Sequence, residues 1–337
     1  MSLYFQNENH KLNVPRPVLQ KETVLNMPSD EIVIREVGLR DGLQSIQRTV
    51  PTAHKLEWIR SAWQAGLREI EVGSFVPPRL LPQLADTAEL VTYAKTLPGL
   101  TVSVLVPNLK GAQRAIESGA DLMLLPLSAS HAHSLANLRK TPEAVVEEIK
   151  HIRAARDAAG STCLIEVGIS TAFGCTIQGH VAPAQVLDLL RAVLDVGVDR
   201  VGLADTVGYA DPRAVEALFT QAFSIAGKRL ACGHFHDTRG LGMANVMAAW
   251  HTGVRRFDAS LAGIGGCPHA PGASGNVASE DLAYLFASMG MPTGIDIQQL
   301  LALRTRVAQW LDGETLHGTL WRAGLPKTFP VAAGATA

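Results

Sequence analysis

The sequence predicts a (β/α)8 TIM barrel with an extra C-terminal helix. Eight short β-branched segments alternate with helix-length segments over roughly 250 residues, which is the usual size of this fold. Most of the short segments are apolar on both faces, as expected for a parallel sheet that is buried on both sides. A doubly wound open sheet is the rival, but it normally has fewer strands and often a glycine-rich phosphate loop, and neither feature is seen.

The elements follow a loose N-terminal arm, residues 1–30, whose first residues, MSLYFQ, resemble the remnant of an expression tag. The predicted strands are, in chain order, 31–37, 68–73, 101–107, 121–127, 162–169, 200–205, 230–236 and 255–262. Helix start signals precede residues 53–65, 143–159 and 213–226. Glycines placed to end helices stand just ahead of later strands: Gly66, Gly119, Gly160, Gly197 and Gly253. Residues 295–313 form the extra amphipathic helix, so we predict one catalytic domain over 31–327 and a mobile tail over 328–337.

The composition argues against several classes of partner. Thirty basic residues nearly balance thirty-one acidic ones, so nothing favours binding to nucleic acid or to a membrane surface. No apolar run approaches the roughly 18 residues of a spanning helix, and the N-terminus lacks the pattern of a signal peptide. The four cysteines are scattered without a CxxC pair, which favours reduced thiols in a cytoplasmic protein.

Ionisable residues gather where the predicted strands end, which is where chemistry is carried in this fold. His234 and His236 are two positions apart on a strand, so both imidazoles point to one face and can approach one ion. Asp41 follows the first strand, and only the eighth strand separates it from the histidines, a gap of roughly 10 Å. Asn276 could add a neutral oxygen. These ligand types suit Mn²⁺, Mg²⁺, Fe²⁺ or Zn²⁺, and hydrogen-bonded rim histidines are the alternative.

Four further residues at the same ends are candidates for catalysis. Arg40 could stabilise negative charge on a substrate oxygen, although a surface ion pair is the commoner fate of an arginine. Glu71 and Asp205 lie at strand ends, where they could transfer protons or simply pair with basic neighbours inside the barrel. Cys267 lies in a glycine-rich loop, where a nearby cation would lower the pKa of its thiol and make proton exchange possible.

Four segments carry a resemblance to a known family: EVGLRDGLQ (36–44), VPNLKG (106–111), HFHDTRGLGMANVMAA (234–249) and SLAGIGGCPHAPGASGN (260–276). They resemble the 3-hydroxy-3-methylglutaryl-CoA lyase family of metal-dependent TIM-barrel enzymes, which are related to isopropylmalate and homocitrate synthases. The resemblance spans about residues 31–327, and the glycine–cysteine loop is its most specific part.

The resemblance implies a retro-Claisen cleavage of 3-hydroxy-3-methylglutaryl-CoA, or of a close 3-hydroxyacyl-CoA relative, to acetyl-CoA and a keto acid. It implies Mg²⁺ or Mn²⁺ held by Asp41, His234, His236 and Asn276. Arg40 would stabilise the thioester enolate, and the residues for proton transfer and positioning would be Glu71, Asp205, Cys267 and His234. Contacts to substrate or coenzyme A are expected from Gln44, Ser74, Asn108, Lys110 and Thr206. The resemblance further implies a homo-oligomer, a dimer or tetramer, acting in leucine degradation.

The sequence departs from the family pattern near the predicted acyl pocket. The first turn reads GLRDG instead of GPRDG, IEVGSF replaces IETTSF around Glu71, and the loop at 128–144 lacks the usual lysine-rich segment. We therefore expect an intact metal site and an acyl group that need not be hydroxymethylglutaryl. The alternatives are a Claisen-condensing synthase and a 4-hydroxy-2-oxoacid aldolase of the same superfamily, an Fe²⁺ oxygenase, and a scaffold without catalysis.

Overall fold

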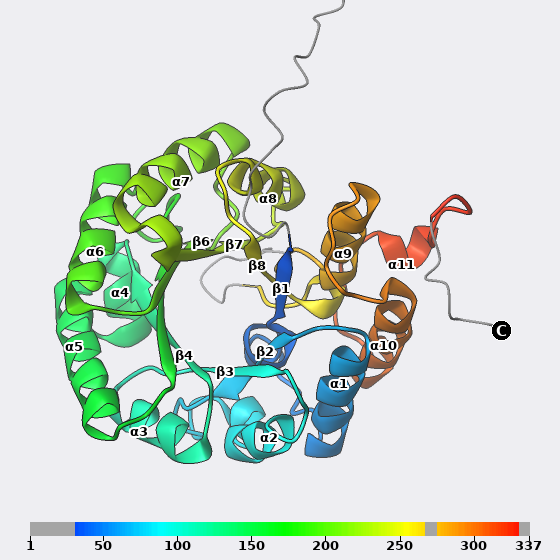
Figure 1. The fold of residues 1–337 in the computed structure, drawn as a ribbon, viewed down its shortest axis with the longest axis horizontal. Coiled ribbons are helices and arrows are strands. Elements are labelled where there is room, and N and C mark those ends of the chain that lie inside the picture. The colour runs from blue at the N-terminus through cyan, green and yellow to red at the C-terminus, as the bar shows by residue number, and fades with distance from the viewer. Residues whose placement is uncertain (1–30, 267–274, 330–337) are drawn as a thin grey trace, which may run out of the picture. The chain divides into compact units, whose positions relative to one another are not determined.

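Eight parallel strands close into a barrel in which each strand pairs with its neighbours in sequence and β8 pairs with β1 (Figure 1). The structure is a computed structural model and describes residues 31–266 and 275–329. The strands are β1 Val33–Glu36, β2 Glu69–Ser74, β3 Thr101–Leu105, β4 Leu122–Ser128, β5 Leu164–Ser170, β6 Arg200–Asp205, β7 Leu230–Phe235 and β8 Arg256–Ala259. The predicted TIM barrel is confirmed. The predicted N-terminal arm and residues 330–337 of the predicted tail lie outside the described residues.

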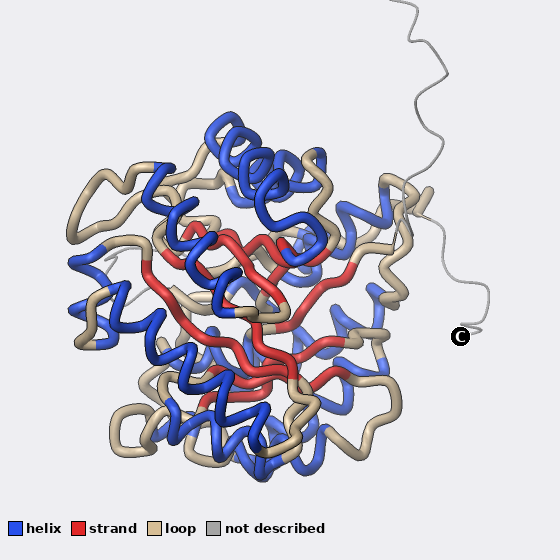
Figure 2. The backbone as a smooth tube through the Cα atoms, turned by 60° about the vertical axis from the view of Figure 1, so that its left-hand side comes forward, coloured by secondary structure: helices blue, strands red, loops and turns tan. Residues whose placement is uncertain are grey.

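Helices surround the strands (Figure 2). They are α1 Thr52–Gln64, α2 Thr87–Ala94, α3 Leu109–Ser118, α4 His131–Leu138, α5 Pro142–Ala158, α6 Pro183–Val196, α7 Pro212–Ala226, α8 Gly242–His251, α9 Ser279–Ser288, α10 Ile297–Trp310 and α11 Leu320–Ala323. Short 3₁₀ turns cover Pro82–Leu84, Gly227–Arg229 and Leu261–Gly263. The predicted extra helix is α10, whose N-cap Asp296 donates its backbone N–H to the carbonyl of Ala65 beside α1 (2.7 Å). Thr141 and Asp211 accept backbone N–H groups at the starts of α5 and α7, as the start signals indicated.

Three segments differ from the sequence-based expectation. The turn after β1 is a single π-helical turn, η1, over Gly38–Gly42. The predicted eighth strand stops at Ala259. After it, the N–H of Ser260 donates to the carbonyl of Val277, which lies outside the eight strands, and Ala262 takes a left-handed conformation (φ 60°). The expected loop at 128–144 contains α4, whose first turn is capped by the Ser130 hydroxyl accepting the N–H of His133.

The inside of the barrel is not uniformly apolar. Side chains alternate across a strand, so Arg35 of β1 points into the barrel while its neighbour Glu36 points outward and accepts a hydrogen bond from Ser279 of α9. One ion pair joins Arg256 of β8 to both carboxylate oxygens of Glu69 on β2, at 2.7 and 2.8 Å. In the described ranges, no helix has the length and apolar character needed to cross a bilayer.

Candidate active site

The π-helical turn η1 places Arg40 and Asp41 at the mouth of the barrel. Three N–H groups, of Arg40, Asp41 and Gly42, point to the carbonyl of Val37, which draws the backbone into a wide turn. A side chain at Gly38 would collide with the Glu36 carboxylate and with Trp58, so this position needs glycine. Single π turns of this kind occur often at functional sites.

Asp41, His234 and His236 converge as predicted, each offering one ligand atom within 4.8 Å of the others. The Nε2 atoms of the two histidines are 3.1 Å apart, and Nε2 of His236 is 3.9 Å from Oδ2 of Asp41. Asn276, paired with His236 through an isolated β-bridge, donates Nδ2–H to the same Asp41 oxygen at 2.7 Å. The structure therefore brings all four predicted ligands together.

The donor set fits a divalent cation. The side-chain oxygen of Asn276 is buried and has no hydrogen-bond partner among the described residues, so a lone pair is left for an ion. Burial, and then the neighbouring His234, lower the pKa of His236 to about 4, so this imidazole is neutral and able to ligate. Two ligands at right angles around an ion with bonds of about 2.1 Å stand roughly 3 Å apart, which matches the spacing of the histidines.

His234 is held in place by a chain of buried charges. Its Nδ1 lies 3.0 Å from Oδ2 of Asp258, which leaves Nε2 directed at His236. Arg35 donates from Nε to Asp258 (2.7 Å) and from Nη2 to Glu166 (2.9 Å). Burial alone would lower the pKa of His234, but the hydrogen bond and charge of Asp258 outweigh it and raise the pKa. The thiol of Cys232 also contacts Asp258 (3.3 Å).

Sequence reasoning missed Asp258, Arg35 and Glu166. A signal was present, because each is a charged residue within an apolar strand that was predicted to be buried, and a buried charge needs a partner. The partners are 223 and 131 positions away from Arg35, so the sequence could not identify them.

Arg40 bridges Asp41, one of the candidate metal ligands, to a buried acid. Its guanidinium lies 2.6 Å from Oδ1 of Asp41 through Nη1 and 2.8 Å from Glu71 through Nε. Glu71 is fully buried, and burial raises the pKa of its carboxyl to about 7 against the attraction of Arg40. Burial opposes the charge on Arg40 as well, but Glu71 and then Asp41 raise the pKa of the guanidinium, which stays positive.

The other predicted residues divide into two groups. Gln44, Asn108 and Thr206 line the central cavity, and Gln44 also donates to Oδ1 of Asp41 (2.7 Å). Ser74 and Lys110 do not line it: Ser74 is buried and accepts the N–H of Val76, and Lys110 is exposed on α3.

Asp205 ends β6 at the same mouth. Its two carboxylate oxygens accept the N–H groups of Tyr209 and Ala210 (2.8 and 3.0 Å), and burial raises its pKa. Cys267 lies outside the described residues.

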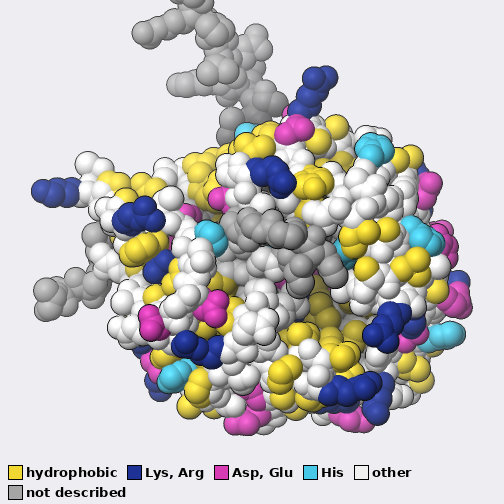
Figure 3. Space-filling view, turned by 180° about the vertical axis from the view of Figure 1, so that it is seen from behind, with side chains coloured by type: hydrophobic (Ala, Val, Ile, Leu, Met, Phe, Trp, Pro, Cys, Tyr) yellow, Lys and Arg dark blue, Asp and Glu magenta, His cyan; other side chains and the backbone are white. Residues whose placement is uncertain are grey.

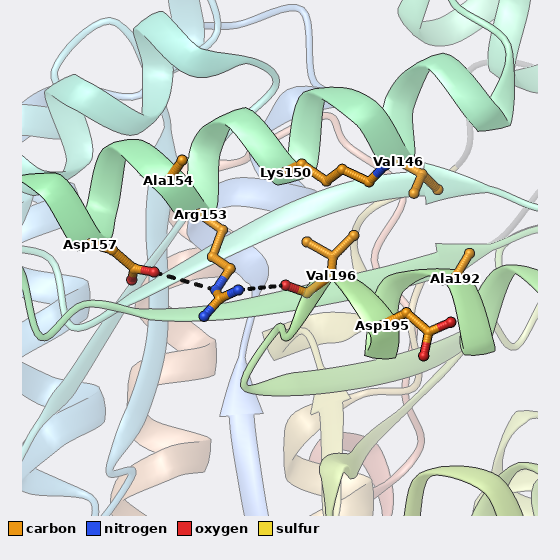
Figure 4. A pocket seen from close by; sticks show the side chains of 8 residues that line it. All are labelled: Val146, Lys150, Arg153, Ala154, Asp157, Ala192, Asp195 and Val196. Atoms are coloured by element: carbon orange, nitrogen blue, oxygen red, sulfur yellow. Dashed lines mark hydrogen bonds and ion pairs between the residues drawn. The ribbon is translucent and has the colours of Figure 1, made fainter.

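The central cavity has a volume of about 730 Å³ and reaches from the mouth, at His236 and Gly265, down to Arg35 and Glu166. A second hollow of about 550 Å³ lies between α5 and α6 on the outer ring (Figure 4). Its Arg153 already bonds to Asp157 and to the carbonyl of Val196, and no candidate residue reaches it. The central cavity is therefore the candidate active site.

Known proteins resemble the chain over most of its length. The family model described as HMGL-like matches residues 31–307. The chain is 38% identical to the mitochondrial hydroxymethylglutaryl-CoA lyase of Arabidopsis thaliana. The matched region covers 80% of the chain and 58% of that relative. It is 37% identical to an (R)-citramalyl-CoA lyase of Chloroflexus aurantiacus, covering 88% of the chain and 95% of the relative.

Among solved structures, an HMG-CoA lyase from Acinetobacter baumannii in complex with coenzyme A and 3-methylmalate matches with a TM-score of 0.84. The two share 38% identity, over 90% of this chain and 98% of that one. The converging ligands, the closed barrel and these matches lead to one conclusion: the chain belongs to the HMGL-like family.

Proposed function

We propose that the protein is a divalent-metal-dependent acyl-CoA lyase that cleaves 3-hydroxy-3-methylglutaryl-CoA, or a close 3-hydroxyacyl-CoA relative, to acetyl-CoA and a keto acid. One observation carries this proposal: Asp41, His234 and His236 converge at the mouth of the central cavity, and Arg40, which pairs with the buried Glu71, lies beside them. A bare metal site would leave several chemistries open. A guanidinium fixed beside the ligands adds stabilisation for an enolate, which is the intermediate of this cleavage.

The residues that would hold the ion are Asp41, His234, His236 and Asn276, and we propose Mg²⁺ or Mn²⁺. Asp41 and Asn276 supply oxygen atoms and the two histidines supply nitrogen, a mixed set that Mn²⁺ accepts readily and Mg²⁺ tolerates. When bound, such an ion polarises the substrate hydroxyl and orients its carboxylate.

The chain's own residues supply the remaining chemistry. A base must take the proton of the substrate hydroxyl, and we assign this to Asp205, which ends β6 at the mouth of the barrel and whose pKa is raised by burial. As the hydroxyl oxygen becomes a carbonyl, the C–C bond breaks and its electron pair passes to the thioester enolate. The remaining N–H groups of Arg40, which Asp41 and Glu71 hold from two sides, lower the cost of that charge.

The enolate carbon must then receive a proton to become acetyl-CoA. We assign this step to Cys267, on the family resemblance of its loop. Glu71 acts through Arg40 as a positioning residue, because its carboxylate is fully buried and pairs with that guanidinium. Cys267→Ala should therefore keep Mn²⁺ affinity at the wild-type value and reduce turnover strongly.

The acyl group is the least constrained part of the proposal. The relatives include hydroxymethylglutaryl-CoA lyases and a citramalyl-CoA lyase at nearly equal identity. The family departure in α4 lies at the cavity, which His133, Ala136 and Asn137 line, so a panel of substrates is needed. The synthase and aldolase alternatives predict condensation products or cleavage of free keto acids.

A coupled assay for acetyl-CoA release tests the proposal. The purified protein is offered 3-hydroxy-3-methylglutaryl-CoA, citramalyl-CoA and longer 3-hydroxyacyl-CoAs, with and without Mg²⁺ or Mn²⁺. Metal-dependent release from at least one is expected. No release from any of them would refute the lyase function, and oxygen consumption with Fe²⁺ would favour the oxygenase. The homo-oligomer stays a prediction that light scattering on the purified protein can check.

A further inference from the structure

The chain after α10 returns to the barrel and lies against the loop that follows β8. This C-terminal strap, residues 312–323, is tied to α9 by Asp281, whose carboxylate accepts the N–H groups of Thr319 and Leu320 (2.7 and 2.8 Å). Seen from behind the view of Figure 1, one face is hollowed near its centre, and the side that carries α9, α10 and α11 lies at the left of this face (Figure 3). No strap residue lines the central cavity, so the strap is outside the chemistry described above.

One arginine of α10 joins the strap to α9. Arg304 has only 4% of its side chain exposed, and it donates from Nε to Oε1 of Glu280 (3.3 Å) and from Nη2 to the carbonyl of His317 (3.4 Å). Its guanidinium also lies over the ring of Trp321, 4.1 Å from the ring centroid. A planar guanidinium can stack on a ring while it donates hydrogen bonds, which an ammonium group cannot do. Arg304 therefore ties α9 to the strap at two points.

Two of these partners also hold the backbone of Ala262, just after β8. Its N–H donates to Oε2 of Glu280 (3.1 Å), and its carbonyl accepts the N–H of His317 (2.8 Å). Ala262 is buried and left-handed (φ 60°, ψ 17°), a conformation that is unfavourable for a residue with a Cβ atom. Such a conformation persists only where the surroundings impose it, and the bonds from Glu280 and His317 supply that restraint.

Two residues further along, Ile264 orients a candidate metal ligand. Its carbonyl accepts the backbone N–H of Asn276 (3.4 Å) and also the Nδ2–H of the same residue (3.1 Å). The second Nδ2 hydrogen goes to Asp41 (2.7 Å). With both of its hydrogens bound, the amide cannot turn, and its oxygen stays available for an ion. A shift of the backbone between Ala262 and Ile264 would release this amide.

We propose that Arg304 is a positioning residue for the candidate metal site: through Glu280 and the strap it holds Ala262, and thereby the carbonyl of Ile264 that orients Asn276. The inference rests on the proposed function for the metal site and extends its machinery to residues outside the cavity. A loop that is already ordered before the ion binds lowers the entropic cost of binding, so loosening it should weaken the affinity.

The test uses Mn²⁺ binding to the metal-free protein, followed by the electron paramagnetic resonance signal of the free ion, and amide hydrogen exchange over residues 261–265. Trp321→Ala is the first variant, because Trp321 is 44% exposed and its removal should leave the fold intact. Losing the ring should weaken Mn²⁺ binding roughly fivefold and speed the exchange by a similar factor. Arg304→Lys should give a similar loss, and combining the two should add little, because both act on one network.

Trp321→Phe is the rescue variant, since it keeps an aromatic face for the guanidinium, and it should stay near the wild type in both measurements. Trp63→Ala is the matched control, because it removes another tryptophan of the helical ring that lies under an arginine, Arg68 (5.8 Å), without contacting the strap. It should lower the urea midpoint and leave Mn²⁺ affinity and the exchange over 261–265 unchanged.

Wild-type Mn²⁺ affinity in Trp321→Ala and Arg304→Lys, or an equal loss in Trp63→Ala, would overturn the inference. A wild type that binds no Mn²⁺ would count against the proposed function. The exchange over residues 261–265 would then decide the inference alone, with faster exchange in Trp321→Ala supporting it and unchanged exchange refuting it.

Discussion

Replacing Asp258 by asparagine tests whether the buried charge chain tunes the metal site. The amide would keep the shape of the carboxylate and could still accept the Nδ1–H of His234, but it would remove the negative charge 3.0 Å from that nitrogen. Hydrogen bonds to charged groups contribute about 1.5–3 kcal/mol and neutral ones about 0.5–1.5 kcal/mol. The midpoints of these ranges differ by roughly 1.25 kcal/mol, which corresponds to about an eightfold loss of metal affinity, near the lower end of the roughly 10–100-fold typical for partners of metal-bound histidines.

The assay is Mn²⁺ binding to the metal-free protein, followed by the electron paramagnetic resonance signal of the free ion. Glu69→Gln is the matched control, because it breaks another buried carboxylate–arginine pair inside the same barrel without touching His234. The control should lower the urea midpoint and leave Mn²⁺ affinity unchanged. Unaltered Mn²⁺ affinity in Asp258→Asn, or an equal loss in Glu69→Gln, would refute the reasoning.

Three further predictions concern stability and the ligand set. Burial raises the pKa of Glu36 from 4.5 to about 7, so between these pH values the carboxyl ionises in the unfolded chain but stays protonated in the folded one. The free energy of unfolding should therefore fall by about 3 kcal/mol as pH rises from about 4.5 to about 7. Glu36→Gln should lose correspondingly less over that window in urea titrations, and parallel pH profiles would contradict this. Gly265→Ala should weaken Mn²⁺ binding, because a Cβ there would meet Nδ2 of Asn276 at 2.6 Å and Oδ2 of Asp41 at 3.0 Å. Gly290→Ala, with a similar positive φ and nothing within 4 Å, should cost stability only. His236→Ala should abolish Mn²⁺ binding in the same measurement, and wild-type affinity would show that the ligand set is wrong.

The positions of the candidate metal ligands could be predicted because they depend on local rules. His234 and His236 share a face through the two-residue period of a strand, and Asp41 follows the first strand of a fold that gathers strand ends at one mouth. The local backbone conformation around these residues could not be predicted. The π turn that carries Arg40 differs from an α-helical turn by one extra residue between the bonded N–H of Gly42 and the carbonyl of Val37. The sequence contains no propensity signal strong enough to distinguish it from an ordinary turn.

The sequence by itself determined the alternation of strands and helices, the barrel and the residue types that meet at its mouth, since hydrophobic periodicity and chain order suffice for these. Only the tertiary structure decided which buried charges pair. Arg35 meets Asp258 because β1 closes the barrel against β8, and it meets Glu166 across the barrel interior. Both contacts depend on closure and strand register, which are settled by the packing of the whole chain. The same reason explains why Ala262, which follows β8, bonds to His317, which lies between α10 and α11.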